Sequence, residues 1–137
     1  MFRVVFASAL LALLTLVAAP AASPAAGSDV TITSAEMDFT AGPTDVIDVI
    51  GFGTCTSAGF ASIQVTKMVD LDTGAIANPF VEFTNCTSPG EHVNWLVRPT
   101  SNDPRAFRPG DRVSISVSAA GAITGTDQKV VVLQQLH

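Results

Sequence analysis

The chain has 137 residues, with 7 Lys and Arg against 12 Asp and Glu, and a formal net charge of −5 at pH 7. This acidic balance argues against nucleic-acid binding and against docking on anionic membranes, because both need a basic surface. With 2 Cys, 2 His and no Tyr, the chain also has few side chains suited to catalysis.

Residues 1–25 have the layout of a secretory signal peptide. Arg3 precedes an apolar run from Val4 to Ala19, and a stretch rich in Ala and Pro follows. Ala19-Pro20-Ala21 fits the small-residue cleavage pattern, so we expect cleavage near residues 21–26 and secretion of the remainder. The alternative is a retained membrane anchor. It is disfavoured because the run is shorter than the roughly 20 residues of a spanning helix, so we expect no membrane span after cleavage.

Residues 29–137 are predicted to form one all-β domain. Several segments alternate apolar and polar residues or are rich in β-branched residues, and none shows helical periodicity with caps. In chain order these segments are 30–37, 45–55, 61–69, 79–86, 92–97, 112–119 and 129–136. Turns rich in Gly, Pro, Asp and Ser separate them. The pattern predicts an antiparallel β-sandwich of about seven strands, with a closed barrel as the alternative.

The segment 112–119 alternates most clearly. Its two faces are Val113, Ile115 and Val117 on one side and Ser114, Ser116 and Ser118 on the other. We expect the apolar side chains to be buried and the serines to be mostly exposed, as in a strand with one wet face.

The aromatic side chains are expected to serve the core. Trp95 lies on the apolar side of its segment, together with Val93 and Val97. The phenylalanines after the leader are few and fall mostly on strand-like segments, so we do not expect a surface for sugars. They are Phe39, Phe52, Phe60, Phe80, Phe83 and Phe107.

Cys55 and Cys86 each end a predicted strand. An even cysteine count in an exported chain predicts a structural disulfide between them. A zinc site would need two further ligands, and neither His92 nor His137 has ligand spacing to the cysteines. A catalytic thiol would need an activating base, which no neighbouring residue in the sequence provides.

The chain contains the stretches GTCTS, TNCTS, NWLV, FRPGDRVSISVSA and KVVVLQ. Together they resemble small secreted actinobacterial domains of unknown function, and the resemblance covers about Val46 to Leu133. Those domains have an immunoglobulin-like sandwich, one cysteine pair and a tryptophan strand. The resemblance implies an immunoglobulin-like fold and export, and it carries no catalytic residues. Because Trp95 follows the second cysteine instead of lying between the two, no antibody-type topology is inferred.

The stretch DLDTG places Asp70 and Asp72 at alternate positions. Calcium prefers such oxygen ligands, but Gly74 stands where the spacing of a calcium hand would put a further ligand. We therefore expect a hairpin turn here and no metal site.

The segment from Thr100 to Gly110 is the predicted recognition loop. It is long, contains Pro104 and Pro109, and concentrates cations near its end. Prolines lower the entropy cost of presenting a fixed surface. The residues expected to contact a partner are Arg105, Phe107, Arg108 and Arg112.

The sequence thus predicts a secreted, monomeric, non-catalytic module that acts by surface contact. Its partner would be an unknown protein or a component of the cell envelope, and no cofactor is expected. One alternative is an inhibitor of an extracellular hydrolase that uses residues 100–110. The other is an uncharacterised hydrolase, whose acids would have to meet in space.

Overall fold

The computed structural model describes residues 28–38, 46–101 and 106–135. The predicted leader and its cleavage region lie outside these residues. The described chain forms strands only, and none of its segments is a helix long and apolar enough to cross a membrane. The strands are β1 Val30–Asp38, β2 Val46–Thr54, β3 Gly59–Asp70, β4 Phe80–Cys86, β5 His92–Val97, β6 Arg112–Gly121, β7 Gly125–Val132 and β8 Gln134–Gln135.

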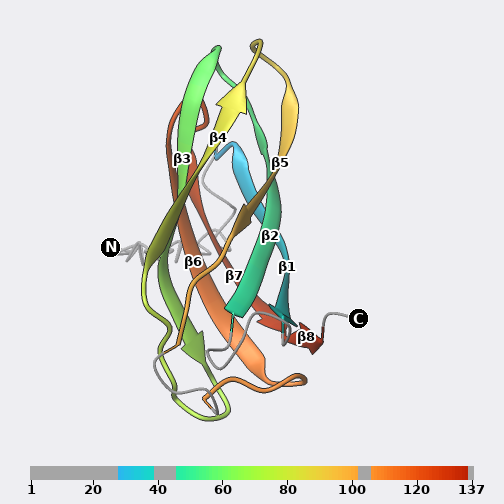
Figure 1. Cartoon of the computed structure of the whole chain (residues 1–137). Helices are drawn as coiled ribbons and strands as arrows, with labels where there is room; N and C mark the ends of the chain where they lie inside the picture. Colours follow the sequence, from blue (N-terminus) through green and yellow to red (C-terminus); the bar gives the residue numbers. More distant parts are fainter. Residues whose placement is uncertain (1–27, 39–45, 102–105, 136–137) are drawn as a thin grey trace, which may run out of the picture.

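The strands form two sheets of four strands each (Figure 1). The first has the order β5-β2-β1-β8 and the second the order β4-β3-β6-β7. All pairs are antiparallel except the short parallel pair of β1 and β8. The prediction of an all-β sandwich is therefore confirmed.

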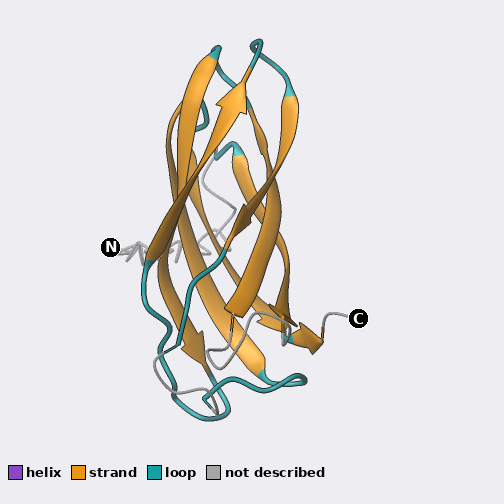
Figure 2. Cartoon of the chain, in the orientation of Figure 1, coloured by secondary structure: helices purple, strands orange, loops and turns teal. Residues whose placement is uncertain are grey.

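The strands run along the long axis, so that loops gather at the two ends of the molecule (Figure 2). The end that carries the turns 55–58 and 87–91 is called the disulfide end. The opposite end, which carries residues 71–79 and 106–111, is called the acidic end. The sequence-distant loops at each end are thereby brought side by side.

The core lies between the two sheets and follows the predicted alternation. On β6, Val113, Ile115 and Val117 are buried, as expected. The three serines between and after them are half-buried, so the prediction that they are mostly exposed is wrong. The pairing register places each serine between longer residues of β3 and β7, for example Ser116 between Lys67 and Gln128, and this position accounts for their partial burial. Trp95 is 4% exposed, which confirms its place in the core.

The end of the chain differs from the prediction of one strand over residues 129–136. β7 begins earlier, at Gly125, and ends at Val132. Leu133 is buried, and its backbone N–H and C=O bond to Asp111 and Gly110, at 2.8 and 2.7 Å. The chain crosses here from one sheet to the other, so that β8 pairs with β1.

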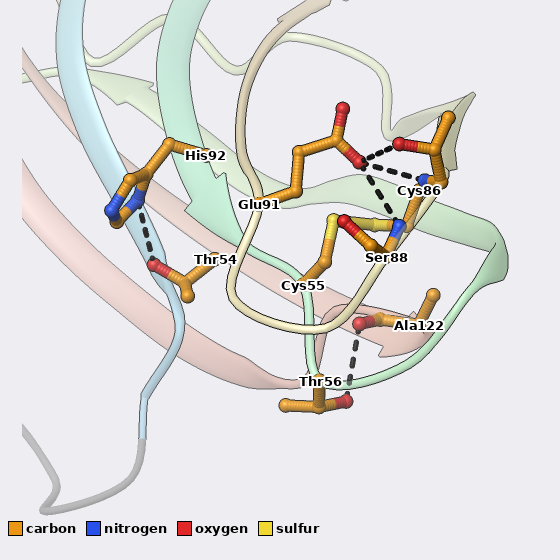
Figure 3. Close-up of a disulfide and its surroundings, with 9 residues drawn as sticks. Thr54, Cys55, Thr56, Cys86, Ser88, Glu91, His92 and Ala122 are labelled. Atoms are coloured by element: carbon orange, nitrogen blue, oxygen red, sulfur yellow. Dashed lines mark hydrogen bonds between the residues drawn. A yellow bond between two sulfur atoms is a disulfide. The ribbon is translucent and has the colours of Figure 1, made fainter.

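Cys55 and Cys86 form the predicted disulfide, with 5.9 Å between their Cα atoms (Figure 3). Cys55 directly follows β2 and Cys86 ends β4. The bond therefore joins the two sheets covalently at one end of the sandwich.

A second link between the sheets is polar. The edge of β1 near Ile32 lies beyond the short β8 and faces β7. The Ile32 N–H donates to the carboxylate of Asp127 at 2.8 Å, and the Lys129 ammonium donates to the Ile32 carbonyl at 3.3 Å. These two side chains satisfy backbone groups that would otherwise form an open strand edge.

Candidate functional site

Phe60 and Phe83 are exposed on the outer face of the second sheet, at 76% and 70%. Phe60 pairs with Asn85 and Phe83 with Ser62, so the two rings belong to diagonally neighbouring positions on β3 and β4. Directly opposed residues in an antiparallel pair project to the same face. The two rings therefore share one surface.

This finding contradicts the expectation that the phenylalanines pack in the core. Phe52 and Phe80 are also exposed, at 44% and 42%, and Phe39 lies outside the described residues. Only Phe107 is buried among the five that the structure describes. The sequence held the signal: Ala61 and Ile63 point inward, so Phe60 must point outward by the two-residue period of a strand.

The outward-facing residues at the strand positions next to the two rings carry no charge. The surface extends from β4 across β3 to β6, because Ser62 opposes Ala120 and Gln64 opposes both Val81 and Ser118. We call this surface the Phe face and define it as Phe60, Ser62, Gln64, Val81, Phe83, Asn85, Ser118 and Ala120. It combines two aromatic rings with hydroxyl and amide groups.

A groove of about 1120 Å³ runs beside β7 and meets this surface at one residue. Ser118 belongs to both the groove and the Phe face. More than half of the lining residues carry a hydroxyl or an amide, including Ser116, Thr126 and Gln128. The charged residues in its lining are Asp127 and Lys129, which already bind the backbone of Ile32.

The described residues of the predicted recognition loop are in part buried. Phe107 is 2% exposed and packs in the core, a position that gives no support to its predicted contact with a partner. The Arg112 guanidinium binds the Asp72 carboxylate at 3.1 Å, and the Arg112 N–H donates to the same carboxylate at 2.7 Å. Arg108 is exposed, and Arg105 lies outside the described residues.

Asp70, Asp72 and Asp111 meet at the acidic end, where one carboxylate oxygen from each lies within 4.8 Å of the others. Contact with the Asp70 carboxyl group, followed by burial, raises the pKa of Asp111. The backbone N–H and then the guanidinium of Arg112 lower the pKa of Asp72. The expected turn after Asp70 is present, since Gly74 N–H donates to the Asp70 carbonyl at 2.8 Å. Sequence spacing does not indicate that Asp111 belongs to this site, because it lies about 40 residues further along the chain, in another loop.

The disulfide end carries a further carboxylate with defined partners (Figure 3). Glu91 accepts hydrogen bonds from the hydroxyl and the N–H of Thr87, both at 2.7 Å. These bonds, led by that of the hydroxyl, lower the pKa of Glu91. Glu91 therefore braces the turn that follows Cys86.

Comparison with protein-family models and with curated proteins finds no match. The resemblance to small secreted actinobacterial domains thus stays a prediction, and the function has to be argued from the surfaces described above.

Proposed function

We propose that the chain is a secreted, immunoglobulin-like, non-catalytic module that binds an uncharged glycan of the cell envelope through the Phe face. The exposure of Phe60 and Phe83 side by side on one sheet face carries this proposal. The disulfide between the sheets supports export, because such bonds persist in oxidising compartments.

The chemistry of the Phe face fits a neutral sugar polymer. Aromatic rings offer flat apolar surfaces against which the C–H groups of a sugar ring can pack. Ser62, Gln64 and Asn85 flank the rings with donors and acceptors for sugar hydroxyl groups. The defined face has no cation to attract an anionic polymer or an anionic membrane. The groove beside β7 gives a long chain further hydroxyl and amide contacts.

The expected binding is weak. Covering two Phe side chains contributes roughly 3–6 kcal/mol of hydrophobic free energy. Much of this is offset by the loss of translational and rotational freedom on association. On an insoluble polymer many binding positions lie next to one another, so a module that dissociates can bind again nearby and stays longer on the polymer.

The test is co-sedimentation of the secreted protein with three insoluble probes: chitin and cellulose, which are neutral, and purified peptidoglycan, whose neutral glycan strands carry charged peptides. The variants are Phe60→Ala, Phe83→Ala and the double substitution. Phe52→Ala is the matched control, because Phe52 is an exposed phenylalanine on the outer face of the other sheet. We expect the wild-type protein and Phe52→Ala to sediment with at least one probe, and the double variant to remain in solution.

Sedimentation with none of the probes, or equal sedimentation of the double variant, would refute the glycan proposal. Analytical ultracentrifugation adds a second readout. A wild-type dimer that dissociates in the double variant would assign the Phe face to self-association instead. The buried position of Phe107 gives no support to the alternative function, a hydrolase inhibitor that uses residues 100–110.

A further inference from the structure

Asp70 is completely buried at the acidic end, and only one of its two carboxylate oxygens has a partner. Oδ1 accepts the N–H groups of Asp72 and Thr73 at 2.8 and 3.0 Å. Oδ2 has no hydrogen-bond partner in the described chain. A buried oxygen of an ionised carboxylate without a partner is costly, because burial removes the water that would solvate it.

Asp70 faces a second carboxyl group, Asp111, which in its ionised form cannot donate a hydrogen bond to the unpartnered Oδ2. Asp111 contacts Asp70 and accepts the Arg108 N–H at 3.0 Å. Two ionised carboxylates in contact repel each other, since both only accept hydrogen bonds. Something positive has to lie between them: a proton or a metal ion.

The Arg112 guanidinium, which lies close to these carboxylates, is bound to Asp72 at 3.1 Å, and no salt bridge joins it to Asp70 or Asp111 within the described residues. Three carboxylates against one guanidinium leave a net charge of −2 when all are ionised. A divalent cation would neutralise this charge.

We propose that Asp70, Asp72 and Asp111 bind a calcium ion. The three ligand atoms lie within 4.8 Å of one another, which fits the roughly 5 Å across a shell of oxygens at 2.3–2.6 Å. The oxygens around magnesium lie closer, with about 4.2 Å across the shell, and magnesium tolerates less irregular geometry. All three side chains offer oxygen, whereas zinc sites usually include sulfur or nitrogen ligands.

The ion would tie two loops together. Asp70 is the last residue of β3, Asp72 lies in the loop that follows, and Asp111 directly precedes β6. The Thr73 hydroxyl already donates to the Ala106 carbonyl between these loops, at 2.9 Å. Asp72 is exposed and Asp111 is half-buried, so water can complete the coordination shell. Such open sites in extracellular modules bind calcium with dissociation constants on the order of 10⁻⁴–10⁻³ M.

The test uses the full secreted chain and measures both direct binding and stability. Isothermal titration with CaCl₂ should give one site, and MgCl₂ should bind at least tenfold more weakly. At about 10 mM calcium, the folding equilibrium constant from urea denaturation should rise about 10- to 100-fold relative to NaCl of equal ionic strength.

Asp70→Asn and Asp111→Asn are the informative variants. An asparagine at position 70 can still accept the N–H groups of Asp72 and Thr73 through its amide oxygen, so the turn is kept while the charge is lost. Both variants should lose the calcium heat and the calcium-dependent rise in stability. Glu36→Gln removes a charge from the other sheet and should leave both unchanged.

Three results would overturn the proposal. The first is the absence of any heat of calcium binding to the wild-type protein. The second is an equal rise in stability with magnesium, or with NaCl at matched ionic strength. The third is an unchanged calcium-dependent rise in stability in Asp70→Asn and Asp111→Asn. The first would indicate that a proton alone is shared by Asp70 and Asp111.

Discussion

The indole ring of Trp95 lies directly against Gly51, its cross-strand neighbour in the pair of β2 and β5. A Cβ atom at position 51 would overlap two carbons of the ring and the carbonyl oxygen of Thr31. The glycine is therefore required by the close approach of a large side chain and of the neighbouring backbone. It gives the single Trp of the chain its place in the core.

Gly51→Ala should destabilise the fold by about 1–3 kcal/mol or more, because the added methyl group meets backbone as well as the ring. Gly53→Ala is the comparison. There the added methyl group would meet the end of the Ile123 side chain, at 2.9 Å, which can move more easily than a backbone atom. Urea denaturation should therefore show a clearly smaller loss for Gly53→Ala, and equal losses would contradict this explanation.

Trp95→Ala should cost about 3–5 kcal/mol of unfolding free energy, the range for deleting a large buried aromatic side chain. Trp95→Phe should cost far less. The indole N–H of Trp95 is buried without a partner among the residues described. Phenylalanine keeps an aromatic ring and removes this unsatisfied donor, whose burial costs about 1–3 kcal/mol. Equal destabilisation by Ala and Phe in denaturant titrations would show that the indole itself is needed.

The strands, their inward faces and the disulfide could be predicted because each depends on a local pattern in the sequence. The two-residue period located seven strands and the inward faces of β6 and β5, since a strand repeats its geometry every two residues. The cysteine count predicted the disulfide. The crossover at Leu133 was missed, because an apolar run of the type VVVL does not reveal where a strand leaves one sheet for the other.

The candidate sites were predicted less well. The phenylalanines were assigned to the core by residue type, although the same period that placed Ile63 inside places Phe60 outside. The contact of Asp70 with Asp111 depends on the pairing of β3 with β6, which places the end of one strand beside the start of the other although the two are far apart in the sequence. Such long-range contacts leave no periodic signal in a single sequence.

Removing the disulfide should destabilise the folded chain. The bond joins residues separated by 31 positions, and the chain-entropy estimate for this loop is roughly 3.5–4 kcal/mol. We expect the double substitution of Cys55 and Cys86 to Ala to lower the denaturant midpoint strongly, because a domain of this size has a total stability of about 5–15 kcal/mol. Intact mass before and after reduction and alkylation gives the matching chemical test. Two free thiols in the secreted protein would contradict the bond.

Glu91→Gln should destabilise the disulfide end in a pH-dependent manner. Hydrogen bonds from Thr87 and from the Ser88 N–H hold the pKa of Glu91 below its ordinary value of 4.5. A carboxylate with a lowered pKa stabilises the folded state above the pKa it has in the unfolded chain, and this contribution is lost as the pH falls through the folded-state pKa. Urea denaturation at a series of pH values should therefore show the difference between wild type and Glu91→Gln at neutral pH and its disappearance in acid.

Thr87→Val should remove part of the same pH dependence, because valine lacks the hydroxyl that donates to Glu91 at 2.7 Å. Ser88→Ala keeps the backbone N–H and should leave the pH dependence intact. A difference of constant size across the pH range would mean that the carboxylate charge of Glu91 has no part in stabilising the turn.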